Sequence, residues 1–91
     1  MSSKANPIIH DKNGRKVFAD SIVIDTVAAE LFIPVKCGNE WGDEFLGDFY
    51  RLDPASIKLV QSHATMEDLR KLMRSGKYSG MRFNVKGDAL G

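Results

Sequence analysis

The 91-residue sequence has a single cysteine, three prolines and no long uninterrupted apolar run. Cys37 has no partner for an intramolecular disulfide, so packing and hydrogen bonds must hold the fold together. The most apolar stretch, residues 22–35, contains Asp25 and Glu30 and is too short and too charged to cross a bilayer. The first seven residues lack the apolar core of a secretory signal. From these absences we expect a cytoplasmic protein.

Residues that perform catalysis or bind metals are few and scattered. Cys37, His10 and His63 show none of the short spacings of zinc sites, and the acids of residues 43–48 lack the periodicity of a calcium loop. A cysteine nucleophile would need a histidine base and an orienting carboxylate, which no spacing indicates. The sequence contains no nucleophile elbow, phosphate-binding glycine loop or dinucleotide fingerprint. We therefore expect no enzyme, no metal and no cofactor, but a protein that acts by binding.

A strong charge of one sign is also missing, because the formal net charge is +1. Hydrophobic residues make up 43% and charged residues 27% of the chain, which is ordinary for one folded domain. We expect that domain over residues 7–86, with flexible ends at 1–6 and 87–91. The charge is distributed unevenly: residues 1–45 hold five basic and seven acidic residues, and residues 46–91 hold eight and five.

A β-hairpin is predicted over residues 8–19. The pair Asn13-Gly14 separates two short β-prone segments and suits a two-residue type I′ turn, in which both residues need positive φ. Such a turn fixes the register and would pair the following residues: Asp11 with Lys16, and Ile9 with Phe18.

The next segment predicts a strand at Ser21–Val27. The residues that follow, 27–33, have two interpretations. Asp25 is able to cap a short helix through Phe32. Alternatively, every second residue from Val27 to Val35 is apolar, which favours a strand that Pro34 confines to an edge. We favour the strand, and an exposed strand at Leu31–Val35 would also permit self-association into a homo-oligomer.

Four aromatic residues alternate with acids and two glycines in the segment Trp41–Tyr50. Trp41, Phe45 and Phe49 are four residues apart, which suits a helix, but each glycine costs about 1 kcal/mol inside a helix. A loop leading into a strand at Phe45–Leu52 is the alternative. A turn follows at residues 53–56, because Pro54 disfavours the helical conformation at Asp53.

The C-terminal third predicts a strand, a helix and a second strand. Ile57–Gln61 is the first strand, and Thr65 and Asp68 have the spacing of a capping box at a helix start. Gly76 ends the helix, whose apolar stripe is Met66, Leu69, Leu72 and Met73. Alternation of Met81, Phe83 and Val85 with polar residues predicts the last strand. The expected fold is α+β: an antiparallel sheet begun by the hairpin, with one main helix packed on it.

Two surfaces are candidates for binding, and they carry opposite charge. The first is the acidic–aromatic segment, which attracts attention because Trp and Tyr are frequent in binding hot spots and acids select a basic partner. Its aromatics suit equally well the anchors of a small core. The candidate residues are Trp41, Asp43, Glu44, Phe45, Asp48 and Tyr50.

The second is the basic succession between Arg70 and Lys86, which contains no acid. Basic residues track phosphates and Tyr78 is able to stack on a base, although a solvated helix face explains the same pattern. The near-neutral total charge argues against a dedicated nucleic-acid binder. The candidate residues are Arg70, Lys71, Arg74, Lys77, Tyr78 and Arg82.

The leading hypothesis is a small non-catalytic protein-binding module, which acts as an adaptor, regulator or inhibitor of a larger partner protein. The alternative is a nucleic-acid-binding protein that uses residues 70–86. No membrane partner is expected.

Overall fold

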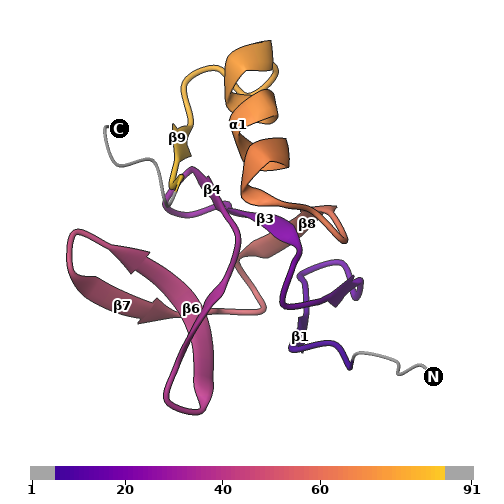
Figure 1. Cartoon of the computed structure of the whole chain (residues 1–91). Helices are drawn as coiled ribbons and strands as arrows, with labels where there is room; N and C mark the ends of the chain where they lie inside the picture. The colour runs from indigo at the N-terminus through magenta and orange to yellow at the C-terminus, as the bar shows by residue number, and fades with distance from the viewer. Residues whose placement is uncertain (1–5, 86–91) are drawn as a thin grey trace.

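The structure, a computed structural model, describes residues 6–85 (Figure 1). The predicted flexible ends lie outside these residues, apart from Asn6. Within the described range the elements follow this order: β1 (Ile9–His10), β2 (Lys16–Val17), β3 (Ile22–Asp25), β4 (Glu30–Phe32), β5 (Val35–Cys37), β6 (Glu40–Phe45), β7 (Asp48–Arg51), β8 (Ile57–Gln61), α1 (Met66–Ser75) and β9 (Arg82–Phe83). The chain is a small α+β domain, as predicted.

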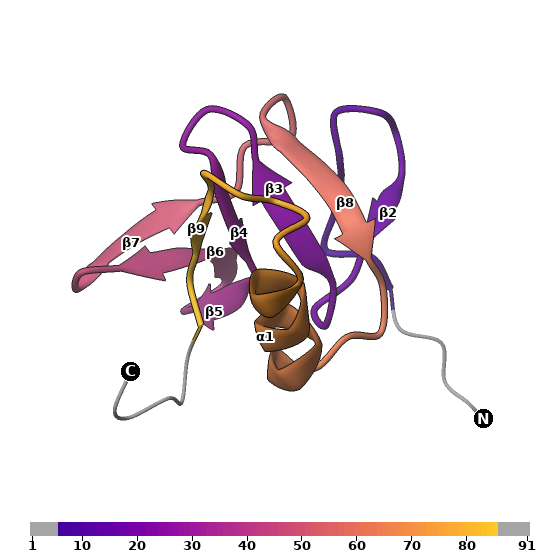
Figure 2. The ribbon, with the colours of Figure 1, turned by 90° about the horizontal axis from the view of Figure 1, so that it is seen from above.

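The central sheet has the strand order β8-β3-β4-β9. β3 pairs antiparallel with both β4 and β8, whereas β9 runs parallel to β4. The predicted strand–helix–strand unit is confirmed, and its two strands form opposite edges of the sheet. Helix α1 covers one face, and the β5-β6-β7 sheet and the β1–β2 hairpin lie on the other side (Figure 2).

Alternation along β3 and β4 divides the apolar core between these two faces. Ile22, Ile24 and Leu31 pack toward Leu69 of the helix. Val23 and Phe32 point the opposite way, into a cluster completed by the N-terminal hairpin and by three buried or half-buried residues: Trp41, Leu52 and Ile57. Because side chains of a strand alternate between faces, Glu30 lies on the same side of β4 as Phe32.

The N-terminal hairpin forms, but its predicted turn and register are wrong. Ile9 pairs with Val17 and His10 with Lys16. Gly14 donates its N–H to the Asp11 carbonyl and has φ +80°, while Asn13 does not have positive φ. This is a type I turn followed by a left-handed glycine, not a type I′ turn, and the extra loop residue shifts the pairing by one. Val17 consequently enters the core, and Phe18 stacks on His63 instead.

Asp11 explains why the longer turn is preferred. One carboxylate oxygen accepts the N–H groups of Asn13 and Arg15, and the other accepts the N–H of Leu59 in β8. The side chain therefore closes its own turn and joins the hairpin to the central sheet. Burial opposes its ionisation, but the three backbone donors prevail and hold the pKa of Asp11 below its usual range.

The ambiguous segment after β3 is a turn followed by a strand. The Asp25 side chain accepts from the N–H groups of Val27 and Ala28, as a helix cap would, but Ala29 then takes a positive φ of 58° and the chain enters β4. The favoured strand is thus confirmed in part, over Glu30–Phe32. The predicted exposed edge at Leu31–Val35 is only partly present: β4 is paired with β3 on one side and with β9 on the other, whereas Val35 begins β5, an outer strand of the β5-β6-β7 sheet.

Residues 35–51 form a three-stranded antiparallel sheet, so neither a helix nor a long loop exists there. The β6–β7 turn consists of Leu46 and Gly47, both with positive φ, which defines type I′. Gly42 is required in β6, because a Cβ atom there would collide with the Tyr50 carbonyl and approach within 2.8 Å of the Phe49 ring. The aromatic ring covers the glycine and replaces its missing side chain.

The turn at residues 53–56, the strand β8 and the helix α1 agree with the sequence prediction. The Thr65 hydroxyl accepts from Asp68 N–H, Asp68 accepts from Thr65 N–H, and Gly76 ends the helix in the left-handed conformation. One member of the predicted apolar stripe is misplaced: Met73 is 42% exposed, while Leu69 is fully buried. No helix in residues 6–85 is long and apolar enough to span a membrane.

Candidate functional site

The acidic–aromatic segment forms most of the β6–β7 hairpin, which projects from the central sheet (Figure 1). Cross-strand partners share a face, and the pairs here are Asp43 with Tyr50 and Phe45 with Asp48. These four residues and Trp41 therefore lie on one face. Glu44, which pairs with Phe49, lies on the other. The predicted site residues are thus brought together, except for Glu44.

Trp41 belongs to the core rather than to an exposed binding surface. Its ring is half-buried against the cluster around Val23 and Phe32, with the Lys36 ammonium 6.0 Å from the ring centroid. A depression of about 280 Å³ lies between Trp41 and β1, bounded by an ion pair of 3.1 Å between Arg51 and Glu40. Trp41 therefore stabilises the attachment of the β6–β7 hairpin to the rest of the domain.

A buried pair of carboxyl groups lies where the hairpin meets the central sheet. Glu30 of β4 is 3% exposed and Asp43 of β6 is 8% exposed, and the two carboxyl groups are close enough for Asp43 to oppose the ionisation of Glu30. The Asn84 amide donates to Asp43 Oδ1 at 2.6 Å and to the Glu44 carbonyl at 2.7 Å. Asn84 therefore connects the segment after β9 to the hairpin.

The environment of Glu30 opposes its ionisation. Burial is the largest cause, the neighbouring Asp43 carboxyl adds to it, and Asp25 contributes further repulsion, so that the pKa of Glu30 rises to about 7. Arg82 acts in the opposite direction. The buried Glu30 Oε2 has no hydrogen-bond partner.

Arg82 is the cation closest to this pair in the described chain. Its guanidinium lies 3.8 Å from Glu30 Oε1, beyond hydrogen-bond length, and 4.4 Å from the centroid of the Phe45 ring. A pocket of about 180 Å³ opens beside these groups. It is lined by Asp25, Ala28, Glu30, Asp43, Phe45, Tyr50 and Arg82.

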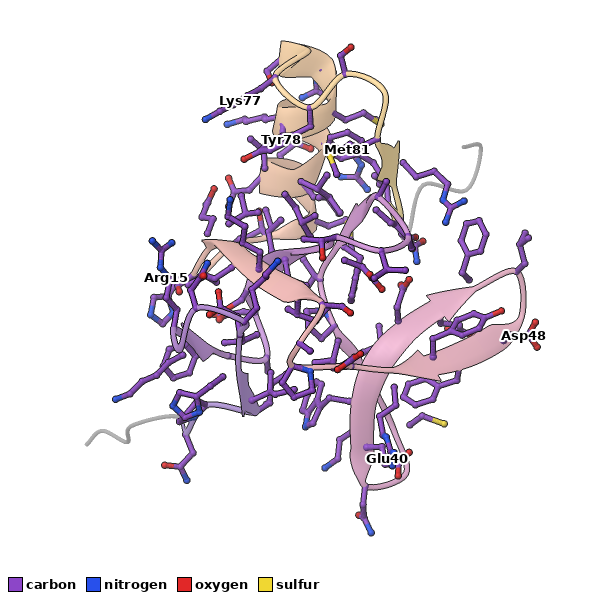
Figure 3. The ribbon with its side chains drawn as sticks, turned by 180° about the vertical axis from the view of Figure 1, so that it is seen from behind. Arg15, Glu40, Asp48, Lys77, Tyr78 and Met81 are labelled. Carbon is purple, nitrogen blue, oxygen red and sulfur yellow. The ribbon has the colours of Figure 1, made fainter. Side chains whose placement is uncertain are left out.

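The tip of the hairpin exposes large apolar side chains. Leu46 is 85% exposed and Tyr50 is 54% exposed, so both side chains have a large area that contact with another molecule would bury. Leu46 also has φ +53°, which is unfavourable for a residue with a branched side chain and suits Asn or Gly far better. Asp48 lies beside this tip (Figure 3).

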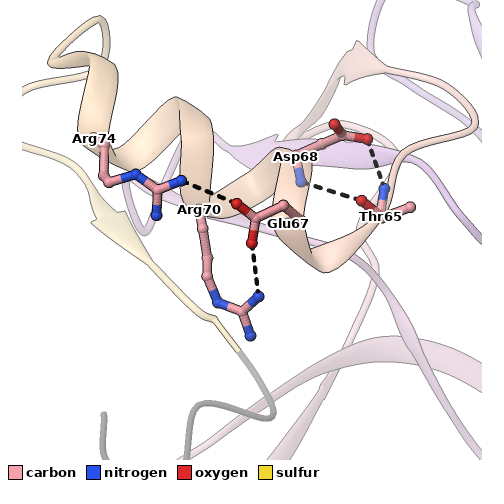
Figure 4. A network of polar contacts seen from close by, with 5 residues as sticks. All are labelled: Thr65, Glu67, Asp68, Arg70 and Arg74. Carbon is pink, nitrogen blue, oxygen red and sulfur yellow. Dashed lines mark hydrogen bonds and ion pairs between the residues drawn. The ribbon is translucent and has the colours of Figure 1, made fainter.

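The basic succession is partly neutralised within the helix. Glu67 accepts hydrogen bonds from Arg74 at 3.0 Å and from Arg70 at 3.2 Å (Figure 4). These contacts, with Arg74 the stronger, hold the pKa of Glu67 below its usual range. The spacing of Glu67 from both arginines along a helix was visible in the sequence, because residues three and seven apart lie on one face.

The remaining predicted basic residues do not form one surface. Lys71 and Lys77 are exposed, but Tyr78 is half-buried against the helix-side core with Lys77 5.8 Å from its ring. Arg82 belongs to the pocket beside the hairpin. Lys77 and Tyr78 lie near the end of the helix, far from Asp48 at the hairpin tip (Figure 3). Lys86 lies outside the described residues.

Sequence reasoning missed three residues that line the pocket, Asp25, Ala28 and Glu30, and also Asn84, which supports it. Glu30 was visible as a single carboxylate within the apolar residues 27–33, at a position that alternation assigns to the same face as Phe32. Asn84 had no comparable signal, because its partner Asp43 is 41 residues distant in the chain.

The cysteine and the histidines lie apart from this pocket, and His63 pairs with Asp20 at 3.3 Å. Cys37 is exposed at the end of β5, His10 lies in β1, and His63 stands before the helix. No group of three or more His, Cys, Asp or Glu residues is arranged to hold a metal ion in that range. The chain matches no protein-family model, no curated protein and no solved structure.

Proposed function

We propose that the chain is a non-catalytic, cytoplasmic protein-binding module that regulates, inhibits or links a larger partner through the β6–β7 hairpin. The observation that carries this proposal is the exposure of Leu46 and Tyr50 on one projecting hairpin. Neither side chain is packed in the core, so packing of the domain does not account for their apolar character. A few residues at the centre of a contact, Tyr frequently among them, supply most of the energy of protein association, and Leu46 adds apolar area beside Tyr50.

The charges around the tip indicate the character of the partner. Glu44 and Asp48 are exposed on the same hairpin, with no basic residue between Glu40 and Tyr50. A partner surface that is apolar at its centre and basic at its rim is complementary to this arrangement. Such complementarity mainly raises the association rate and depends on salt.

Leu46→Asn tests the proposal, because it separates binding from stability. Asparagine tolerates the left-handed conformation of this turn, so the variant should be as stable as the wild type or more stable by about 1 kcal/mol. If the tip binds a partner, affinity capture from a cell lysate treated with nuclease should lose the partner that the wild type retains.

Met73→Gln is the matched control, since it removes an exposed apolar side chain from the helix instead. It should leave capture unchanged. Equal capture by the wild type and the Leu46→Asn variant would refute the role of the tip, and thermal unfolding of each variant would show that the domain remains folded.

Nucleic-acid binding is the second candidate, favoured by the exposure of Lys71 in the helix and Lys77 just after its end. Binding of this kind releases counterions, so affinity must fall linearly with salt on logarithmic axes. A Lys71→Gln/Lys77→Gln variant should then elute earlier from heparin than the wild type. Absence of retention on heparin or DNA at low salt would exclude this function.

A further inference from the structure

The pocket between β4, β9 and the β6–β7 hairpin is lined by more acids than cations, so that it has an excess of negative charge once Glu30 is ionised. Three of its lining residues are acids, Asp25, Glu30 and Asp43, and one is a cation, Arg82. Arg82 does not compensate fully, because it approaches Glu30 no closer than 3.8 Å and its side chain is 52% exposed. The pocket is thus able to accept a further positive charge.

The most buried polar group of this pocket also has an unmet hydrogen-bonding capacity. Glu30 Oε2 is enclosed and accepts no hydrogen bond, which is costly for a buried oxygen and unusual in a folded protein. The groups that surround the carboxyl, Asp43 and Arg82, both line the pocket, so the carboxyl lies at its wall. A donor that enters the pocket beside Glu30 would satisfy this oxygen.

The other walls suit an organic cation rather than a metal ion. Phe45 and Tyr50 contribute aromatic rings, and a ring face attracts an ammonium group. Phe45 already holds the Arg82 guanidinium in this way, at 4.4 Å. A metal ion is disfavoured, because the described acids are not arranged to chelate one.

We propose that this pocket receives the side-chain ammonium of a lysine from the partner protein, which displaces Arg82 from its place over Phe45. The ammonium donates to Glu30 Oε2 and its methylene stem lies against Phe45 and Tyr50. Arg82 occupies the entrance until the partner arrives. This inference rests on the proposed protein-binding function, and it assigns the partner a lysine next to the surface that contacts Leu46.

The test uses n-butylammonium as the probe and the full chain at pH 8, where Glu30 is largely ionised. Its binding is followed through the ring signals of Phe45 and Tyr50 in NMR titrations. We expect saturable shifts with n-butylammonium, and none with n-butanol at the same concentrations. Equal shifts with the alcohol, or saturable binding of n-butylguanidinium in place of the amine, would overturn the lysine assignment.

Variants of the pocket give the second arm. Glu30→Gln keeps the shape of the side chain and removes the charge, so n-butylammonium should bind at least tenfold more weakly. Arg82→Gln opens the entrance and should strengthen binding several-fold. Glu40→Gln removes one exposed acid at the far end of the same hairpin, outside the pocket, and serves as the matched control, with unchanged affinity. Unchanged affinity in the Glu30→Gln variant would refute the proposal.

The failure of this inference is distinguishable from failure of the hairpin-tip function. The Leu46→Asn variant should bind n-butylammonium like the wild type even where it no longer captures a partner. Conversely, the wild type and the Glu30→Gln variant could capture the partner equally while neither binds n-butylammonium. That outcome would refute the lysine pocket and keep the role of the hairpin tip.

Discussion

Glu30 and Leu46 are two residues placed where their own chemistry is unfavourable. Glu30 is a carboxyl buried beside another carboxyl, and Leu46 is an exposed apolar residue with positive φ. Strain and buried charge of this kind persist only where the surrounding structure imposes them, and they are frequent at functional positions. Both residues border the same hairpin, which is why our proposals meet there.

The pKa of Glu30 gives a prediction about stability. The pKa of Glu30 is about 7 in the folded state and 4.5 ordinarily, so between these pH values the folded state keeps a proton on Glu30 that the unfolded state loses. The contribution of Glu30 to stability is therefore full below pH 4.5 and is lost as the pH rises to about 7. Glu30→Gln lacks this titration. Between pH 4.5 and pH 8, the free energy of unfolding of the variant should therefore gain about 2 kcal/mol relative to the wild type. Urea unfolding at both pH values measures it, and a pH-independent difference would contradict the shift.

At the scale of elements, the β1–β2 hairpin is held to the central sheet by the burial of Val17 and by hydrogen bonds of two of its residues. Each of its strands has two residues, too few for independent stability. Asp11 joins it to β8 through Leu59, and the Lys12 N–H donates to the Ile57 carbonyl at 2.8 Å. The side chain of one residue thus connects two elements that are 48 positions apart.

Asp11→Ala should therefore release the hairpin as a unit. Removing the carboxylate leaves three backbone N–H groups without their acceptor, and we expect a loss of about 3 kcal/mol in the free energy of unfolding. Hydrogen exchange should accelerate at Leu59 and Arg15 together. The control is Asp53→Ala, which removes an acceptor from an exposed turn and should cost about 1 kcal/mol. Loss of protection at only one of the two amides would argue against a common role.

The sequence predicted local structure well where one residue type determines the conformation. Thr65, Asp68 and Gly76 define the helix, and Pro54 the turn, through contacts within a few residues. The sequence predicted local structure poorly where contacts with residues distant in the chain determine the conformation. Asp11 selects the turn of the first hairpin because Leu59 is within reach, and Leu46 adopts a turn that its own propensity opposes because β6 and β7 pair around it. The pocket was not predictable, because β4, β6 and β9 meet only in the folded chain.

At the scale of the whole molecule, two buried acids set opposite limits on stability. The pKa of Asp11 is lowered from its ordinary 3.8, so its contribution is present above that value and is lost as the pH falls through the folded pKa. The contribution of Glu30 is lost as the pH rises from 4.5 to about 7.

Thermal unfolding across the pH scale should consequently show a maximum at about pH 4 to 5, lower than most proteins. Glu30→Gln should flatten the alkaline side of this curve, and Asp11→Asn the acidic side. A maximum at pH 7 or above in the wild type would show that other groups dominate.

The position of β9 at the edge of the central sheet has a consequence for the order of synthesis. Arg82 and Asn84 are made after every other residue that lines or supports the pocket. Until they emerge from the ribosome, β4 lacks the N–H donors that Arg82 and Asn84 supply to the Ala29 and Leu31 carbonyls, and Asp43 lacks its amide partner. Before that point β4 has an unpaired strand edge, which is covered only when β9 docks.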